Sequence, residues 1–396
     1  MSLPLDGLRV LTIEQYGAGP YCSMFLADMG AEVIKIENPA SGGDFARVTG
    51  PYFLGENDSL YFQSFNLNKK SLTLDLKSEA GKEILHKLVR SSHAVINNMR
   101  GNQPAKLGLD YAALKAVNSK IVCGHISAYG RENSRASWPG YDYLMQAEAG
   151  FLSVTGEPGG PPARFGLSIV DFMTGTMLAY GTTAAILKAQ NTGEGGDVDV
   201  SLMDTALHQL TYPGIWYLNE GLVTGRNARG AHPSVTPSQL VRSKDGWVFI
   251  MCQNPRFWDL LLDGIDHETL GQDERFKDLA ARLENRDALT VELDKVFSDR
   301  TTEDWVEHFK GKIPISPVYN MAEALDNPFL DETKMVTEVD HPDRPFMRVL
   351  QNPILLDGQR LPAGPGPKLG QDTDELLREA GYTDEDIASM RSDGIV

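Results

Sequence analysis

Asp171 is the residue whose type and surroundings could do the most chemistry in this sequence. A turn-rich segment, residues 155–162, precedes it, and a helical pattern rich in Ala, Leu, Met and Thr follows over residues 174–190. One carboxylate therefore stands where a loop enters a helix, and helix starts expose amides that favour negative charge. Two interpretations stay open. Asp171 is an N-cap, a common role for Asp, or it is a nucleophile beside amides that stabilise developing charge.

The N-terminal segment predicts a strand–helix–strand unit. Residues 8–13 and 32–37 have the pattern of buried strands, and a helical pattern over residues 21–29 follows the turn Gly17-Ala18-Gly19-Pro20. This order implies a parallel sheet. Gly17, Gly19 and Glu37 match part of a dinucleotide-binding fingerprint. Cys22 occupies the third glycine position, so the match is weak support for a nicotinamide enzyme.

Further segments extend the α/β pattern. We predict strands at residues 72–74, 93–99, 120–126 and 197–201, and helices at residues 78–91 and 202–218, with a further helix that opens within residues 139–143 and runs to about residue 148. Arg100 and Lys106 follow a predicted strand. Because ligands of open α/β sheets bind beyond the carboxyl ends of strands, these two cations are candidates for anion binding.

A change to loop composition near residues 224–233 indicates a second domain, as the chain length also suggests. We expect an α/β fold with a Rossmann-like parallel-sheet large domain over residues 1–225 and 327–396. A smaller α+β domain would cover residues 226–326. The chain would end in two short helices, the second beginning at the capping-box-like sequence Thr383-Asp384-Glu385-Asp386.

Composition excludes several classes of protein. The 396 residues carry a net charge of −17, which argues against nonspecific binding to nucleic acid or to an anionic membrane. Three distant cysteines, Cys22, Cys123 and Cys252, form neither a disulfide framework nor a zinc motif. No signal peptide or membrane span is recognisable, so we expect a cytoplasmic protein.

The absence of metal-binding and phosphate-binding motifs favours chemistry carried out by side chains alone. The sequence has no P-loop, HExxH or GxSxG motif. Asp204 and His208 lie four residues apart on one predicted helix face. Without a third ligand, ordinary helix polarity is favoured over a metal site, and we predict none.

Eight segments in chain order together resemble the class III coenzyme A (CoA) transferases, also called the CaiB/BaiF family, which includes formyl-CoA transferase and the carnitine CoA-transferases. The resemblance spans nearly the whole chain. The segments are Leu5-Asp6-Gly7-Leu8-Arg9-Val10-Leu11, Ala18-Gly19-Pro20, Met29-Gly30-Ala31-Glu32-Val33-Ile34-Lys35-Ile36-Glu37, Asn66-Leu67-Asn68-Lys69-Lys70-Ser71, Leu107-Gly108-Leu109-Asp110-Tyr111, Pro139-Gly140-Tyr141-Asp142, Asp171-Phe172-Met173-Thr174-Gly175 and Gly381-Tyr382-Thr383-Asp384-Glu385.

The resemblance implies roles for individual residues. The family's nucleophilic aspartate falls on Asp171, which favours the nucleophile over a cap alone. Asn38 stands where relatives often carry arginine. The family's mobile glycine-rich loop corresponds to Gly230-Ala231-His232-Pro233-Ser234, which has one glycine. The positions implied to contact substrate or CoA are Tyr16, Ala18, Leu72, Asn98, Met99, Lys106, Asp142, Gly230, Ala231 and His232.

The resemblance also implies a mechanism and an assembly. Asp171 would attack an acyl-CoA thioester such as succinyl-CoA, pass through an aspartyl-CoA thioester and return CoA to a small carboxylic acid. An ordinary Asp has a pKa of about 3.9, so it would be ionised at neutral pH without a partner base. No metal or tightly bound cofactor is needed, and CoA enters as substrate. Relatives are typically interlocked homodimers.

Alternative functions remain. An acyl-CoA racemase shares the fold, but racemase relatives carry Gly-His-Asp where this chain has Gly140-Tyr141-Asp142. Tyrosine, with an ordinary pKa of about 10, is a poor base. A noncatalytic acyl-CoA-binding protein is the other alternative. Basic side chains could pair with a dicarboxylate or lie on the surface, and surface positions are favoured. These side chains are Arg47, Arg131 and Arg229.

Overall fold

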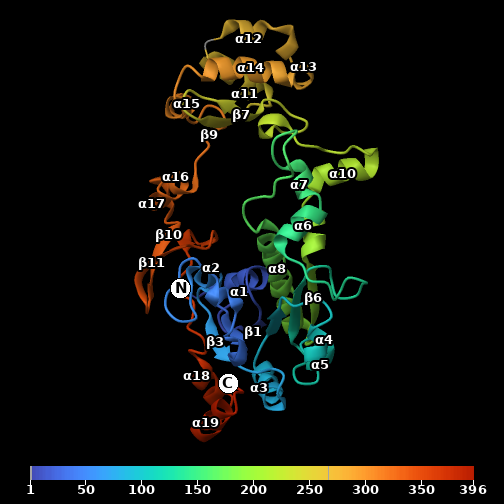
Figure 1. The fold of residues 1–396 in the computed structure, drawn as a ribbon, viewed down its shortest axis with the longest axis vertical. Coiled ribbons are helices and arrows are strands. Elements are labelled where there is room, and N and C mark those ends of the chain that lie inside the picture. The colour runs from blue at the N-terminus through green and yellow to red at the C-terminus, as the bar shows by residue number, and fades with distance from the viewer. Residues whose placement is uncertain (1, 266) are drawn as a thin grey trace. The chain divides into compact units, whose positions relative to one another are not determined.

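A six-stranded parallel sheet organises the larger part of the chain (Figure 1). The computed structural model describes residues 2–265 and 267–396. The order of the strands reverses between β1 and β4, so ligands are expected at the carboxyl ends of these two strands. This sheet confirms the predicted α/β class. In spatial order its strands are β3 (Lys70–Thr73), β2 (Glu32–Glu37), β1 (Arg9–Ile13), β4 (Ala94–Asn97), β5 (Val122–Ser127) and β6 (Gly196–Ser201).

Helices join the strands, and most begin at a recognisable sequence signal. Ser78 caps α3 (Glu79–Arg90) by accepting a hydrogen bond from the Gly81 amide, and Ile84, Leu85 and Leu88 form its buried stripe. The other helices of this part are α1 (Ala18–Asp28), α2 (Leu60–Asn66), α4 (Pro104–Leu107), α5 (Tyr111–Leu114), α6 (Asp142–Glu148), α8 (Ile169–Thr192) and α9 (Leu202–His208).

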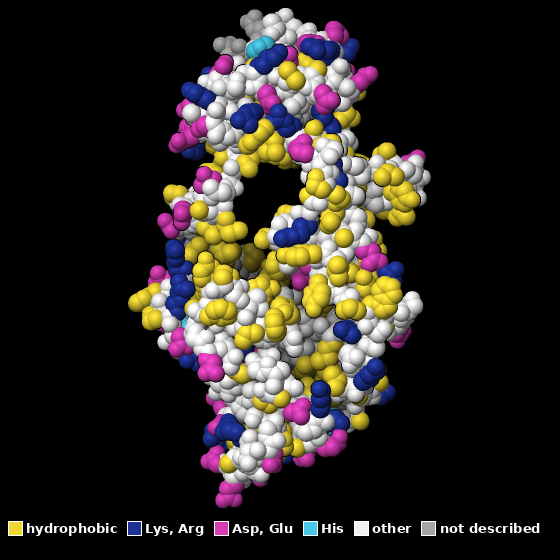
Figure 2. Space-filling view, viewed as in Figure 1, with side chains coloured by type: hydrophobic (Ala, Val, Ile, Leu, Met, Phe, Trp, Pro, Cys, Tyr) yellow, Lys and Arg dark blue, Asp and Glu magenta, His cyan; other side chains and the backbone are white. Residues whose placement is uncertain are grey.

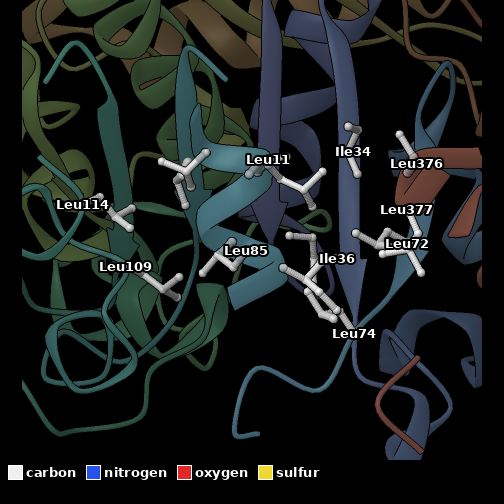
Figure 3. Close-up of a cluster of buried hydrophobic side chains, with 14 of the residues drawn as sticks. Leu11, Ile34, Ile36, Leu72, Leu74, Leu85, Leu109, Leu114, Leu376 and Leu377 are labelled. Carbon is white, nitrogen blue, oxygen red and sulfur yellow. The ribbon is translucent and has the colours of Figure 1, made fainter. Parts of the chain in front are cut away.

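Side chains from several elements form the core on one side of this sheet (Figure 3). Leu11, Ile34 and Leu72 contribute from β1, β2 and β3. Leu85 of α3 and Leu376 of α18 (Thr373–Glu379) pack against them. Strands that are buried on both faces carry near-continuous apolar runs, as β4 does, whereas β2 also carries the buried charged residues Lys35 and Glu37.

The C-terminal segment returns to the sheet. The Asp372 carboxylate accepts a hydrogen bond from the Ser71 amide of β3 at 2.8 Å. The last helix, α19 (Asp384–Ser392), begins with a capping box between Thr383 and Asp386, which confirms the sequence prediction. Before it lie α17 (Phe329–Thr333), the hairpin of β10 (Val336–His341) and β11 (Arg344–Leu350), and the short pair β12 (Leu355–Leu356) and β13 (Gln359–Arg360).

Residues 150–165 and 211–328 form a second compact unit. A three-stranded antiparallel sheet lies against a core that includes Trp258, Phe297 and Trp305. Its elements are α7 (Phe151–Val154), α10 (Thr211–Glu220), β7 (Ser238–Arg242), β8 (Trp247–Met251), α11 (Pro255–Ile265), α12 (Glu268–Gln272), α13 (Leu279–Glu284), α14 (Arg286–Phe297), α15 (Thr302–Phe309), β9 (Ile315–Pro317) and α16 (Met321–Leu325).

The helix predicted over residues 202–218 is two helices. Thr211 has φ +47°, a left-handed backbone conformation that a continuous helix does not contain, and it separates α9 from α10. The compact units also divide the chain here. The sequence-based boundaries grouped residues 150–165 and 211–225 with the large domain instead, and that assignment stays a prediction.

The surface and the cysteines fit the composition. On the face shown in Figure 2, acidic and basic side chains are interspersed rather than gathered into one broad basic field. Cys22, Cys123 and Cys252 are free and buried. Within residues 2–265 and 267–396, no helix is long and apolar enough to cross a membrane.

Candidate active site

A cleft of about 490 Å³ lies at the carboxyl ends of the parallel strands. The residues that follow β1 and β4 meet here, at the point where the strand order reverses. Asp171 is part of its wall. The wall also includes Tyr16, Gly17, Ala18, Asn38, Asp44, Lys77, Asn98, Met99, Arg100, Trp138 and Tyr141.

Asp171 is not the N-cap of its helix. Helix α8 begins at Ile169, earlier than the sequence pattern indicated, and Asp171 lies in its first turn. The capping group comes from another helix. The buried Asp142 carboxylate accepts hydrogen bonds from the amides of Val170 at 2.6 Å and Asp171 at 3.1 Å. The capping interpretation of Asp171 is therefore wrong, because Asp142 occupies that role.

The electrostatic setting of Asp171 differs from that of an ordinary surface carboxylate. Burial raises the pKa of Asp171, and the negative charge of Asp142 raises it further, to about 7. The sequence predicted that Asp171 is fully ionised at neutral pH. With a pKa of about 7, the carboxyl group is instead only about half ionised there. A carboxylate with a higher pKa is also a stronger nucleophile once it is ionised.

The turn that precedes α1 lies directly beside this carboxylate. A methyl group added at Gly17 would stand 3.0 Å from Asp171 Oδ2, so only a glycine leaves this approach open. Gly175 allows α8 an equally close approach, since a methyl group there would lie 2.6 Å from the Ala18 carbonyl oxygen. The first amides of α1 have no acceptor within the helix and are available to an anion.

Asn98 joins the two strands at the switch point. Its Oδ1 accepts a hydrogen bond from the Gln15 amide at 2.9 Å, and its Nδ2 donates to the Gln15 carbonyl at 2.7 Å. The side chain after β4 thus holds the backbone after β1. Asn98 was implied as a CoA contact by resemblance, and the structure gives it this additional role.

The structure brings together four of the residues implied to bind CoA. Tyr16, Ala18, Asn98 and Met99 line the cleft. Lys106 is exposed on α4, one residue before the cleft-lining Leu107.

Leu72 and Asp142 are not among the residues that line the cleft. The Leu72 side chain is fully buried in the core beneath the sheet, because its position on β3 faces that core rather than the strand end. Asp142 is buried and holds the start of α8. Any contact of Leu72 with a ligand would have to use its backbone.

The loop with Gly230, Ala231 and His232 belongs to the second unit. His232 stacks on Tyr212, with ring centroids 5.5 Å apart, and its Nε2 lies 3.0 Å from the tyrosine hydroxyl. Arg286 donates to the His232 carbonyl oxygen at 2.7 Å. Burial and the nearby Arg286 charge lower the pKa of His232. The expected role of this loop stays a prediction.

The three arginines considered for a dicarboxylate are engaged within the chain. Arg47 is buried and forms a two-point ion pair with Glu37. Glu37 is the acidic residue of the partial dinucleotide-binding fingerprint. Arg131 pairs with Asp199, and Arg229 pairs with Asp294. Arg47 was expected at the surface, and that expectation is wrong.

Some lining residues escaped the sequence analysis. Asp44, Lys77 and Trp138 line the cleft, although none was singled out. Lys77 follows β3, and the rule that ligands bind after strand ends could have found it, as it found Arg100. Asp44 and Trp138 lie in loops without a local signal. Asn38 lines the cleft while its side chain accepts a hydrogen bond from the Ala40 amide.

The described side chains contain no group of three His, Cys, Asp or Glu residues that could hold a metal ion. Asp204 and His208 are both exposed on α9.

Comparison with known proteins identifies the family. The sequence description of CoA-transferase family III matches residues 5–373. The chain belongs to CoA-transferase family III. This class III CoA-transferase is 31% identical to a succinate–glutarate CoA-transferase of Agrobacterium fabrum, over 95% of each chain. It is 32% identical to an acetyl-CoA:oxalate CoA-transferase of Acetobacter aceti, again over 95% of each chain.

The fold of the CoA-transferase agrees with a solved structure. A CaiB/BaiF family protein from Brucella suis superimposes with a TM-score of 0.84 at 30% identity, covering 96% of this chain and 100% of that one. The fold and the enzyme class expected from the sequence are both confirmed.

Proposed function

We propose that this enzyme moves CoA from an acyl-CoA thioester to a small carboxylic acid through a covalent intermediate on Asp171. The observation that carries this proposal is the position of Asp171. Its carboxylate stands in the cleft beside the Gly17 turn, and no described side chain forms an ion pair with it. A carboxylate that burial destabilises, in a cleft, is a candidate for chemistry rather than for structural pairing.

The proposed reaction has two matched halves. An Asp171 oxygen attacks the thioester carbonyl carbon, the carbon–sulfur bond breaks, and a mixed anhydride and CoA thiolate form. The thiolate attacks the Asp171 carbonyl carbon, which releases the donor acid and leaves an aspartyl-CoA thioester. The acceptor carboxylate then attacks the carbonyl carbon of this thioester, which breaks the carbon–sulfur bond and gives a second mixed anhydride and CoA thiolate. The thiolate attacks the acceptor's carbonyl carbon in that anhydride, and the carboxylate of Asp171 leaves. Free Asp171 and the new acyl-CoA result.

The chain's own residues would serve these steps by binding and by electrostatics. The first amides of α1 would stabilise negative charge that develops on the carbonyl oxygens beside Asp171. Tyr16, Ala18, Asn98 and Met99 would contact CoA, with Lys77, Arg100 and Lys106 near the cleft as cations for its phosphates. Binding energy from the remote nucleotide would hold CoA between the two halves.

The relatives suggest which acids to test first. Several related proteins are named for succinate, glutarate, mesaconate or oxalate, which are dicarboxylic acids, and one is named for cinnamoyl-CoA and phenyllactate. We therefore propose succinyl-CoA as the first donor to examine and short dicarboxylates as the first acceptors.

We also propose that the active enzyme is a homodimer. Met177, Tyr180 and Leu187 are exposed on α8, and Ile215 and Leu218 are exposed on α10. Rows of exposed apolar side chains on helices are typical of interfaces. Native mass spectrometry would measure the stoichiometry, and a monomer at micromolar concentration would contradict this proposal.

Intact-protein mass spectrometry after incubation with a panel of acyl-CoAs tests the mechanism. Hydroxylamine or borohydride trapping followed by peptide mapping would place a modification on the peptide that contains Asp171. The donor that reacts would identify the substrate class. If no adduct forms with any donor, while an α-proton exchanges in deuterated water, the enzyme is an acyl-CoA racemase instead. Binding with neither result would indicate an acyl-CoA-binding protein.

A further inference from the structure

A buried charge network borders the cleft, whose wall includes two of its members, Glu14 and Asp44, and it takes no part in the proposed reaction steps. Its members are Glu14, Lys35, Asp44 and Lys69, all buried. Lys35 Nζ lies 2.9 Å from Asp44 Oδ2, and Lys69 Nζ lies 3.0 Å from Glu14 Oε1. Buried ion pairs contribute little net stability compared with apolar packing, so the retention of two adjacent pairs needs another explanation.

The network holds the backbone of one short segment. Lys35 Nζ donates to the Glu14 carbonyl at 2.9 Å, and Lys69 Nζ donates to the Pro20 carbonyl at 2.9 Å. Asp44 Oδ1 accepts a hydrogen bond from the Tyr16 amide at 3.2 Å. The segment between these contacts is residues 15–19, here called the Gln15–Gly19 turn. Both of its ends are therefore held by charged groups that solvent does not reach.

Tyr16 is the residue of this turn that most needs support. Its φ is +60°, a left-handed conformation that a residue with a side chain rarely adopts. Such a conformation persists only where surrounding contacts enforce it, and it occurs most often at functional sites. Here the amide of this residue is held by Asp44, and the amide and carbonyl of the preceding Gln15 are held by Asn98.

The conformation of Tyr16 sets the direction of the next residues. Gly17 follows at once and lies against Asp171 Oδ2, and α1 begins at Ala18. A rotation at Tyr16 would turn the first amides of α1 relative to the carboxylate. Electrostatic stabilisation of a transition state depends on donors that are already oriented before the reaction.

We infer that Asp44, held by Lys35, is a positioning residue for the transfer: it fixes the Gln15–Gly19 turn so that the first amides of α1 lie beside Asp171. The inference rests on the proposed function, because it assigns these amides to charge that develops at Asp171. Asp44 would affect the rate of transfer only by fixing the conformation of the Gln15–Gly19 turn.

Two substitutions separate this role from simple capping. Asp44 is also the N-cap of the short helical turn Phe45–Val48, where it accepts a hydrogen bond from the Ala46 amide at 2.9 Å. In Asp44→Ser the hydroxyl can still cap that turn, but its single short oxygen cannot also hold Tyr16 and Lys35. In Asp44→Asn, Oδ1 can still accept from the Tyr16 amide, but the Nδ2 that replaces Oδ2 is a donor, so this variant removes the Lys35 contact and keeps the contact with the turn.

Asp58 provides a matched control. It is buried like Asp44, and its Oδ2 lies 2.9 Å from His341 Nε2. It does not line the cleft. Asp58→Ser therefore removes the side-chain contacts of another buried carboxylate, none of which involves the Gln15–Gly19 turn.

The experiment measures the rate at which an acyl-CoA adduct forms on the full-length enzyme in a single turnover, together with the dissociation constant of CoA and the unfolding temperature. We expect Asp44→Ser to slow adduct formation by about 30-fold or more while CoA affinity changes by less than about threefold. Asp44→Asn should lose less than about fivefold, and Asp58→Ser should lower the unfolding temperature without slowing adduct formation.

The possible outcomes are distinct. If Asp44→Ser lowers the unfolding temperature but reacts as fast as the wild type, Asp44 is merely structural and the inference is overturned. Equal slowing by Asp58→Ser would also overturn it, because the effect would then be general destabilisation. If the wild type itself forms no adduct with any donor, the proposed function falls, and this inference falls with it.

A second measurement needs no variant and covers the case in which Asp44→Ser does not fold. Residue-resolved hydrogen exchange of the wild type should show slow exchange at the Gln15 and Tyr16 amides, which donate to side chains, and faster exchange at Ala18 and Gly19. CoA should then protect Ala18 and Gly19. Uniform fast exchange from residue 15 to 19 would show that the turn is not held and would refute the inference.

Discussion

Asp171 and Asp197 are two carboxylates of the same parallel-sheet unit with opposite electrostatics. Burial and Asp142 raise the pKa of Asp171 to about 7. Burial alone would also raise the pKa of Asp197, but hydrogen bonds from His125 and the Tyr111 amide, with the charge of Arg131, lower it to about 2. Asp197 Oδ1 lies 2.9 Å from His125 Nε2, and Oδ2 lies 3.2 Å from an Arg131 nitrogen.

The difference teaches how to separate structural from reactive carboxylates. Asp197 at the start of β6 is surrounded by donors, so its charge stabilises the fold. Asp171 has a negative neighbour instead, so its charge opposes the fold and is available to react. Three substitutions, measured in four ways, sharpen or break this comparison.

The largest effect is expected for Asp171→Asn. It should reduce CoA transfer by about 10³-fold or more, because the amide cannot act as the nucleophile. Steady-state transfer from succinyl-CoA to a dicarboxylate measures this. Asp197→Asn, the same chemical change at the structural carboxylate, is the control and should keep activity within about twofold. Full activity in Asp171→Asn would refute the nucleophile.

Asp197→Asn should instead lower the free energy of unfolding by about 1–2 kcal/mol, because His125 and Arg131 lose a charged partner that is partly solvated. Urea unfolding at neutral pH measures this. Since the pKa of Asp197 is lowered in the folded protein, its contribution is complete above about pH 4 and is lost as the pH falls towards 2. An unchanged stability at pH 7 would contradict the structural role.

The rate of adduct formation should depend on pH through Asp171. Only the ionised carboxylate attacks, so the rate should fall about tenfold per unit below a midpoint near pH 7. Asp142→Asn keeps an oxygen to cap α8 but removes the charge, so the midpoint should move to lower pH. Single-turnover rates from about pH 5 to 8 measure both midpoints. Identical midpoints would exclude Asp142 as the source of the shift.

The smallest effect is a gain in stability. At pH 8, Asp171→Asn should raise the free energy of unfolding by about 1 kcal/mol, because it removes a charge that burial and Asp142 disfavour. Since the folded pKa lies above the unfolded one, this gain should fade as the pH falls from about 7 to 4, where Asp171 becomes protonated in both states. A loss of stability at pH 8 would mean that the ionised carboxylate has a stabilising partner.

The sequence by itself determined the α/β class, most strands of the sheet and the importance of Asp171. These features depend on short-range signals. The strand pattern of β2, the Gly17-Ala18-Gly19 turn and the capping box at Thr383 are each readable within a few residues. Parallel order then follows from the alternation of strand and helix.

Only the tertiary structure decided what holds these parts and how the reactive carboxylate behaves. Helix α8 begins at Ile169 because Asp142, 28 residues before Val170, accepts hydrogen bonds from amides in the first turn of this helix. The pKa of Asp171 depends on the same distant residue. Asp44 reaches Tyr16 across another 28 residues. Contacts of this kind leave no periodic pattern in the chain, because hydrogen bonds and charges act through distances that folding alone creates.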